Sequence, residues 1–318
     1  MDPVSSTRSV YVMLIFSTLF WGSNFNLGKY VLDAVDPLAA AAWRFLLAAG
    51  LMVLVVLFKE RPDWQGIRRN LPALFIMALV GIFGFNVAFF YGLHTTSSIN
   101  GALIMTLNPT LTVVLAAIVM KEAVTGRQLL GLVLSMAGIV VVVTSGSWQR
   151  LIQLHFAMGD LLLLVGNLCW AVYSVMGKRA VKKLSTLQTT AVTMLIGAAA
   201  IAGLAIAAHA GTLTLPPVSS LSALGIMALF GTVLAYLFWN KGISTIGPAR
   251  TSVFFDLVPI FTMLIAIGLG QEVILAQWLG AALVMVGVLF SSGALETWSK
   301  SRIVESVHQP LGGRPHGG

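Results

Sequence analysis

The residues of this 318-residue chain that could do chemistry are polar side chains set inside long apolar segments. Asn24 follows Trp21 in the first apolar segment, Asn86 lies in the third and Asn108 lies in the fourth. An amide in lipid is costly, so each of these side chains either packs against a neighbouring helix or lines a cavity. In a cavity, the amides would hydrogen-bond the polar groups of a small ligand.

Aromatic side chains accompany these amides and could stack on a flat apolar substrate. The candidates are Trp21 in the first segment, Phe90 and Tyr91 near the end of the third together with His94, Trp170 and Tyr173 in the sixth, and Tyr236 and Trp239 in the eighth. Simple helix packing is the alternative for the tryptophans. For the group near the end of the third segment, the alternative is an interfacial aromatic belt, with a solvated His94.

Two charges fall inside apolar segments, and a charge in a membrane is a functional hypothesis by default. Asp256 lies near the middle of the ninth segment, where it would be a proton carrier, a counter-ion to a substrate amine or a structural, neutral acid. Arg44 lies within the second segment, and the alternative for its side chain is to reach the membrane interface by snorkelling.

Enzyme signatures are missing from the sequence. It has no Gly-rich phosphate loop ending in Lys-Ser or Lys-Thr and no Gly-x-Ser-x-Gly nucleophile motif. The five histidines show no metal-ligand spacing, and the single cysteine, Cys169, excludes an intrachain disulfide. We therefore expect no catalytic residue, no metal and no cofactor.

Composition places the chain in a membrane. Hydrophobic residues make up 58% of it and charged residues only 9%, whereas a soluble domain carries about 25% charged residues. The net charge of +8 does not indicate nucleic-acid binding, because the basic residues are dispersed over short segments instead of forming one stripe.

The two halves of the chain repeat each other at a nearly constant offset. Trp21 recurs as Trp170, 149 positions later, and we expect these two repeat mates to lie near each other around a pseudo-twofold axis. The same register pairs Leu19, Gly28 and Lys29 with Leu168, Gly177 and Lys178. At 150 positions, it pairs Gly81, Gly92, Pro109 and Glu122 with Gly231, Gly242, Pro259 and Glu272. A proline kinks a helix, so the paired prolines interrupt one span in each half, which points to a site at the midplane.

We read ten spans from the length of the apolar segments, since about 20 residues cross a membrane. They are Val10–Val31, Pro37–Phe58, Leu71–Tyr91, Ser98–Met120, Thr125–Thr144, Ala157–Arg179, Ser185–Ala208, Val218–Asn240, Gly247–Gly268 and Ile274–Ala294. Five spans per half is an odd number, so the second copy must be inverted. The sequence thus predicts an all-α membrane protein with two inverted five-helix repeats, at 10–146 and 157–295. They would be joined by an external loop at 147–156 and flanked by tails at 1–9 and 296–318, the latter disordered.

Lys and Arg set the expected orientation. With the N-terminus inside, 16 of the 19 basic residues fall in cytoplasmic loops and tails. The positive-inside rule therefore predicts that both termini face the cytoplasm.

An ordered set of motifs resembles the EamA-type drug/metabolite transporters. It comprises Trp21-Gly22-Ser23-Asn24-Phe25, Pro37 with Arg44, Asn108-Pro109 with Glu122, and Gly131 with Gly138, and then Pro259, Glu272, Gly280 and Gly287 in the second half. The resemblance covers residues 10 to 295, and within the family the chain is most similar to the YddG-type aromatic amino acid exporters. The second half departs from the pattern, with Val258 before Pro259 and Ala171-Val172-Tyr173 after Trp170.

The resemblance implies a secondary transporter of the bacterial inner membrane that exports small metabolites, here aromatic or neutral amino acids, by alternating access. Spans 1, 3, 4, 6, 8 and 9 would line the cavity, with aromatic walls for the side chain and amides for the polar groups. Export of drugs or aromatic cations is the alternative within transport, with Asp256 as counter-ion. A membrane-bound enzyme or a receptor is the alternative from another class. The substrate, the coupling ion and the oligomeric state stay open.

Overall fold

The computed structural model describes residues 3–120, 126–147, 149 and 157–291, and these are helical without a strand. The first half contains α1 (Pro3–Leu32), α2 (Pro37–Lys59), α3 (Trp64–Met77), the π-helix η1 (Ala78–Gly84), α4 (Phe85–Thr95), α5 (Ser98–Met105), α6 (Asn108–Met120) and α7 (Gly126–Val143). The second half contains α9 (Met158–Arg179), α10 (Thr186–Ala208), α11 (Val218–Ala228), the π-helix η2 (Leu229–Leu234), α12 (Ala235–Ile246), α13 (Pro248–Ser252), the 3₁₀-helix η3 (Val253–Asp256), α14 (Leu257–Gly268) and α15 (Leu275–Ser291).

Eight helical stretches in this part of the chain are long and apolar enough to cross a membrane. Two shorter apolar helices, Leu129–Val142 and Leu275–Gly287, fall where the fifth and tenth spans were predicted. The third predicted span is shorter than the observed helical stretch, which begins at Trp64 instead of Leu71. The Asp63 side chain caps this helix by accepting a hydrogen bond from the Gly66 amide at 2.9 Å, as helix N-caps commonly do.

One helix in each half carries a π-helical turn at its centre. Gly81 lies in η1 and its repeat mate Gly231 lies in η2. A π-turn adds a residue to the helix and frees backbone groups for other partners, and such turns are frequent at functional sites.

The interruptions predicted at the paired prolines are also present. The helix breaks between α5 and α6 just before Pro109, and η3 precedes Pro259. Both halves are therefore irregular at corresponding places.

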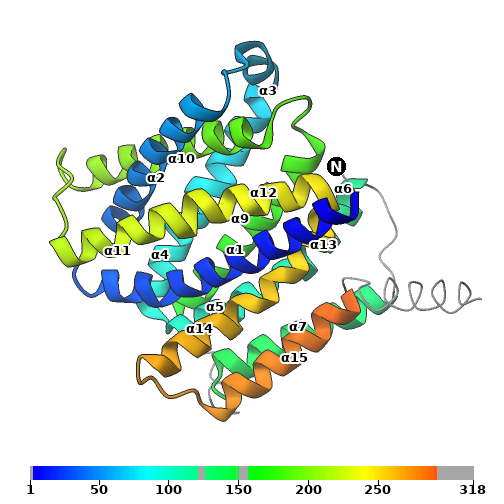
Figure 1. Ribbon diagram of the computed structural model, residues 1–318. Helices are drawn as coiled ribbons and strands as arrows, with labels where there is room; N and C mark the ends of the chain where they lie inside the picture. The colour runs from blue at the N-terminus through cyan, green and yellow to red at the C-terminus, as the bar shows by residue number, and fades with distance from the viewer. Residues whose placement is uncertain (1–2, 121–125, 148, 150–156, 292–318) are drawn as a thin grey trace, which may run out of the picture.

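The helices pack around α1, which runs beside α11 and α12 on one side and α14 on the other (Figure 1). The pair α7 and α15 lies at one edge, where a Cβ added to Gly138 would be 2.8 Å from the Gly280 carbonyl oxygen. Only small residues allow two helix backbones to approach so closely. Many large apolar side chains face outward, such as Phe58, which is 86% exposed, as expected where lipid is the solvent.

Several predictions fall on residues outside the described part of the chain. These are Glu122, almost all of the 147–156 loop and the whole 296–318 tail. The proposed roles of these segments stay predictions.

Candidate functional site

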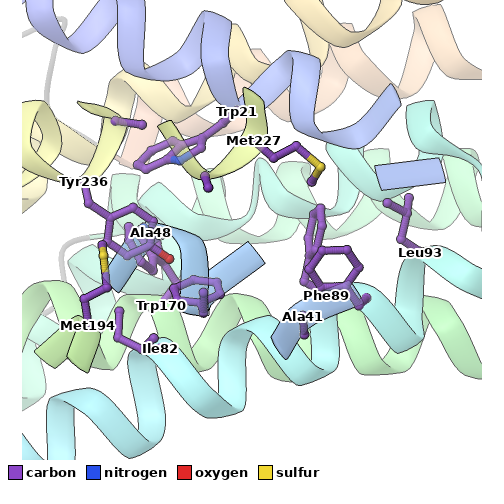
Figure 2. Packing of buried hydrophobic residues seen from close by; sticks show 14 of the residues in the cluster. Trp21, Ala41, Ala48, Ile82, Phe89, Leu93, Trp170, Met194, Met227 and Tyr236 are labelled. Atoms are coloured by element: carbon purple, nitrogen blue, oxygen red, sulfur yellow. The ribbon is translucent and has the colours of Figure 1, made fainter. Parts of the chain in front are cut away.

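Four aromatic rings from three helices meet in the centre of the protein. Trp21 of α1 lies 5.5 Å from Trp170 of α9 and 4.9 Å from Trp239 of α12, between ring centroids. Tyr236 of α12 lies 5.0 Å from Trp170, and Figure 2 shows Trp21, Trp170 and Tyr236 gathered together. The expected proximity of the two repeat-mate tryptophans is confirmed. We call these four residues the aromatic cage.

The cage borders a small central cavity. Its lining residues are Trp21, Asn24, Phe25, Arg44, Phe85, Phe89, Met105, Trp170, Tyr236 and Phe255. The cavity volume is about 20 Å³, room for roughly one water molecule. In this conformation, the cavity therefore has no room for a molecule much larger than water.

The polar side chains of the cavity converge on one backbone carbonyl. The Gly231 oxygen accepts hydrogen bonds from Trp21 Nε1 at 3.0 Å, Asn24 Nδ2 at 3.3 Å and Arg44 Nη2 at 3.2 Å. A Cβ at Gly231 would lie 2.2 Å from the Asn24 amide, so glycine is needed for this approach. The π-turn thus orients three side chains from two other helices.

Arg44 is buried, and the snorkelling alternative is wrong. Its side chain is 3% exposed, and its Nε donates to Thr232 Oγ1 at 2.8 Å. The guanidinium carbon also lies 5.4 to 6.0 Å from the ring centroids of Phe45, Phe89 and Phe90. These distances are in the range of cation–π attraction, so aromatic rings and two hydrogen bonds hold the charge in the core.

Asn86 and Tyr236 are repeat mates that touch each other. Asn86 Nδ2 donates to Tyr236 Oη at 3.4 Å and to the Ile82 carbonyl at 2.8 Å. The two residues are 150 positions apart. Asn86 therefore lies behind the cage and positions one of its rings.

Asn108 is not among the residues that line the cavity. Its Nδ2 donates to Asn167 Oδ1 at 2.8 Å, and Asn167 Nδ2 donates to the Ile104 and Met105 carbonyls at 3.0 and 3.4 Å. These carbonyls belong to the last turn of α5, just before the break that precedes α6. The Ile104 carbonyl also accepts a backbone hydrogen bond from the Leu107 amide at 3.2 Å. The pair of amides thus adds side-chain hydrogen bonds to the backbone beside the break.

Of the other predicted site residues, Tyr173 and Phe90 are buried in the core, and Tyr91 and His94 lie on the surface. Tyr173 stacks on Trp170 at 5.0 Å and Phe90 is fully buried near Arg44. Tyr91 and His94 are exposed, so the structure does not bring them to the cage.

Asp256 lies next to the cavity-lining Phe255 at the end of η3. Its Oδ1 is buried and has no hydrogen-bond partner among the described residues.

Sequence reasoning named Arg44 as a charge inside a span without placing it at the cavity, and it missed four apolar lining residues, namely Phe25, Phe85, Met105 and Phe255. Helical spacing could have found some of them. Phe25 follows Trp21 by four positions, and Phe89 follows Phe85 by four, so each pair shares one helix face. In the part of the chain that the structure describes, no group of three or more His, Cys, Asp or Glu residues could hold a metal ion.

Comparison with known proteins identifies the family. The pattern of the EamA-like transporter family matches residues 8–144 and again residues 157–293. This chain belongs to the EamA-like transporter family. It is therefore a multi-pass membrane transporter built from two copies of the family's repeat.

Several bacterial proteins are similar to this chain in sequence. The uncharacterized transporter YyaM of Bacillus subtilis is 42% identical over 288 residues, which cover 90% of this chain and 94% of that one. A Chlamydia muridarum protein named S-adenosylmethionine/S-adenosylhomocysteine transporter is 27% identical over 72% of this chain and 74% of its own. The uncharacterized inner membrane transporter YedA of Escherichia coli is 25% identical over 86% and 89%. The YddG-type subfamily is not confirmed by these relatives and stays a prediction.

A solved structure shares the fold. It superimposes with a TM-score of 0.68 over 92% of this chain and 99% of its own, at 20% sequence identity. At that identity the likeness concerns the fold alone.

Proposed function

We propose that this transporter exports small metabolites, aromatic or neutral amino acids, across the bacterial inner membrane by alternating access. The observation that carries the proposal is the aromatic cage, which α1, α9 and α12 build in the centre of the protein from both halves of the chain. Aromatic faces and edges bind flat side chains, and each ring contact contributes about 0.5–1.5 kcal/mol beyond area burial.

A second cavity supplies a route toward the cage. It has a volume of about 220 Å³ and is lined by Met77, Gly177, Lys178, Val181, Leu184, Thr186, Thr189, Asn240, Ile243 and Ser244. Its lysine places it on the side that we expect to be cytoplasmic.

A hydrogen-bonded group separates this cavity from the cage. Asn240 Nδ2 donates to Tyr173 Oη at 2.9 Å and to Thr190 Oγ1 at 2.8 Å, and Tyr173 stacks on Trp170 of the cage. We propose this group as the inner barrier of the transport cycle, which must rearrange before a substrate can pass from this cavity to the cage.

We also propose that the chain has ten spans arranged as inverted repeats, with both termini in the cytoplasm. Reciprocal contacts support this arrangement. A Cβ on Gly81 would meet Tyr173, and a Cβ on its repeat mate Gly231 would meet Asn24, the repeat mate of Tyr173. A single-cysteine reporter at Ser147 should react from outside and one at Lys183 should not, in a background without Cys169.

Transport by the purified protein tests the proposed function. In liposomes that contain only this protein, labelled phenylalanine, tryptophan and leucine should move down their gradients, while empty liposomes should not pass them. S-adenosylmethionine belongs in the panel because a relative is named for it. An enzyme or a receptor would give no flux of any compound, and that result would contradict the proposal.

Export of drugs or aromatic cations is the second candidate, and Asp256 is the residue that would favour it. Against it, the cavity lining contains Arg44 and no acidic residue in the described part of the chain. Flux of aromatic cations without flux of amino acids would decide for this candidate.

A further inference from the structure

We propose that Arg44 is the specificity-determining residue of this transporter and binds a carboxylate of the substrate. The inference rests on the proposed function and narrows it to metabolites that carry a carboxylate, with free aromatic α-amino acids as the best fit. Arg44 lines the central cavity and lies among the cage and its neighbouring phenylalanines.

The charge of Arg44 has no acidic counterpart. Its side chain is 3% exposed, and no Asp or Glu of the described residues forms an ion pair with it. A buried charge without a paired opposite charge is costly. Ionisable residues inside membrane-spanning segments are rare and commonly mark the pathway of a substrate or an ion.

Two hydrogen bonds fix the orientation of the Arg44 guanidinium and use only part of its N–H groups. Thr232 Oγ1 donates its own proton to the Met227 carbonyl at 3.0 Å, which leaves its lone pairs for Arg44 Nε at 2.8 Å. Arg44 Nη2 donates to the Gly231 carbonyl at 3.2 Å. A guanidinium has five N–H donors, so donors beyond these two bonds remain for a ligand. A planar, fixed set of donors matches a carboxylate, which can accept two of them at once.

The cavity also offers an acceptor for the ammonium group of an amino acid. Asn24 Oδ1 is buried and accepts no hydrogen bond from the residues described. Asn24 and Arg44 donate to the same carbonyl, that of Gly231, so a carboxylate bound to Arg44 and an ammonium bound to Asn24 would be neighbours, as they are in an α-amino acid. The aromatic side chain would then lie against Trp21 and Trp170.

Analogues of one substrate test the assignment without any mutation. In proteoliposomes with the wild-type chain, uptake of labelled phenylalanine should be competed by phenylalanine and by 3-phenylpropionate, which keeps the carboxylate. Phenylalaninamide and phenylethylamine, which lack the carboxylate, should compete about 30-fold more weakly or worse, the loss typical of removing one partner from a buried charge pair. Equal competition by the acid and the amide would overturn the proposal.

Variants locate the effect at Arg44. Arg44→Gln should raise the KM for phenylalanine by about 30-fold or more and affect the weak flux of phenylalaninamide much less. Arg44→Lys should restore part of the discrimination. If Arg44→Gln does not fold, Thr232→Val keeps the charge, loosens the guanidinium and should raise the KM for the acid alone. Equal losses for acid and amide in a folded variant would assign Arg44 a structural role.

The result also separates this inference from the proposed function. If the wild-type chain carries aromatic amines or amides and no carboxylate, transport stands and the assignment of Arg44 falls. If it carries no member of the panel, the proposed function fails and the assignment falls with it.

Discussion

Replacing Gly231 with alanine should damage both the fold and transport. The added Cβ would lie 2.2 Å from the side-chain amide of Asn24, well inside van der Waals contact. Asn24 is 3% exposed, so its amide cannot swing into solvent, and either it or η2 must shift. Overpacking of this kind costs about 1–3 kcal/mol. The shift would also disturb the carbonyl that orients Trp21 and Arg44.

Gly225→Ala is the matched control, because a Cβ there meets nothing within 4 Å on the same helical stretch. Both variants are compared with wild type by thermal unfolding in detergent and by phenylalanine flux in liposomes. We expect Gly231→Ala to unfold at a lower temperature and to transport poorly, and Gly225→Ala to match wild type in both assays. A Gly231→Ala variant with wild-type stability and flux would refute the role of the Gly231 carbonyl in orienting Trp21 and Arg44.

Three further predictions concern the cage, the buried acid and a surface ion pair. Trp21→Ala and Trp170→Ala should each weaken transport of tryptophan about five-fold more than transport of leucine, since a ring contact is worth about 1 kcal/mol. Trp64→Ala is the control, because Trp64 is exposed. Equal losses of tryptophan and leucine transport would indicate general damage to the fold. Asp256→Asn keeps the shape and removes titration, so accumulation driven only by a pH gradient should persist if Asp256 is structural, as we expect, and should disappear if it carries protons. The Ala205 carbonyl and Asp36, whose carboxylate lies 3.0 Å away, raise the pKa of His209 above 6.5. Protonation of His209 therefore stabilises the fold at low pH, and this contribution is lost as the pH rises from about 6.5 through the raised pKa. In that pH window, the melting temperature of the His209→Gln variant should fall less than that of the wild type. If the melting temperatures of the two proteins change in parallel with pH, the His209–Asp36 pair does not contribute to stability.

The sequence predicted the membrane spans well because lipid imposes a simple rule on each helix. Length and apolarity alone placed α2, α9 and α10 within one residue of their observed starts. The third span was less accurate because its helix continues beyond the apolar segment, back to the Asp63 cap and past Pro72. A cap is a local feature that composition does not reveal.

The candidate site was only partly predictable, because the sequence does not reveal which faces of the helices meet. The repeat register placed Trp21 beside Trp170, since repeat mates lie around a common axis. The same register gave no sign that Arg44 reaches Thr232 and Gly231 of a distant helix. Nothing in the sequence indicated that Asn108 pairs with Asn167 beside a helix break, because Asn167 has no motif of its own. The ligand-binding role of Asn108 stays a prediction.

Counterflow tests the central claim most directly. Liposomes that contain the purified protein are loaded with unlabelled phenylalanine and diluted into a trace of labelled phenylalanine, without ATP and without a pH gradient. A carrier that alternates access to one site should accumulate label transiently above the outside concentration and then lose it. Label that only equilibrates, with no overshoot, would contradict transport by alternating access at the aromatic cage.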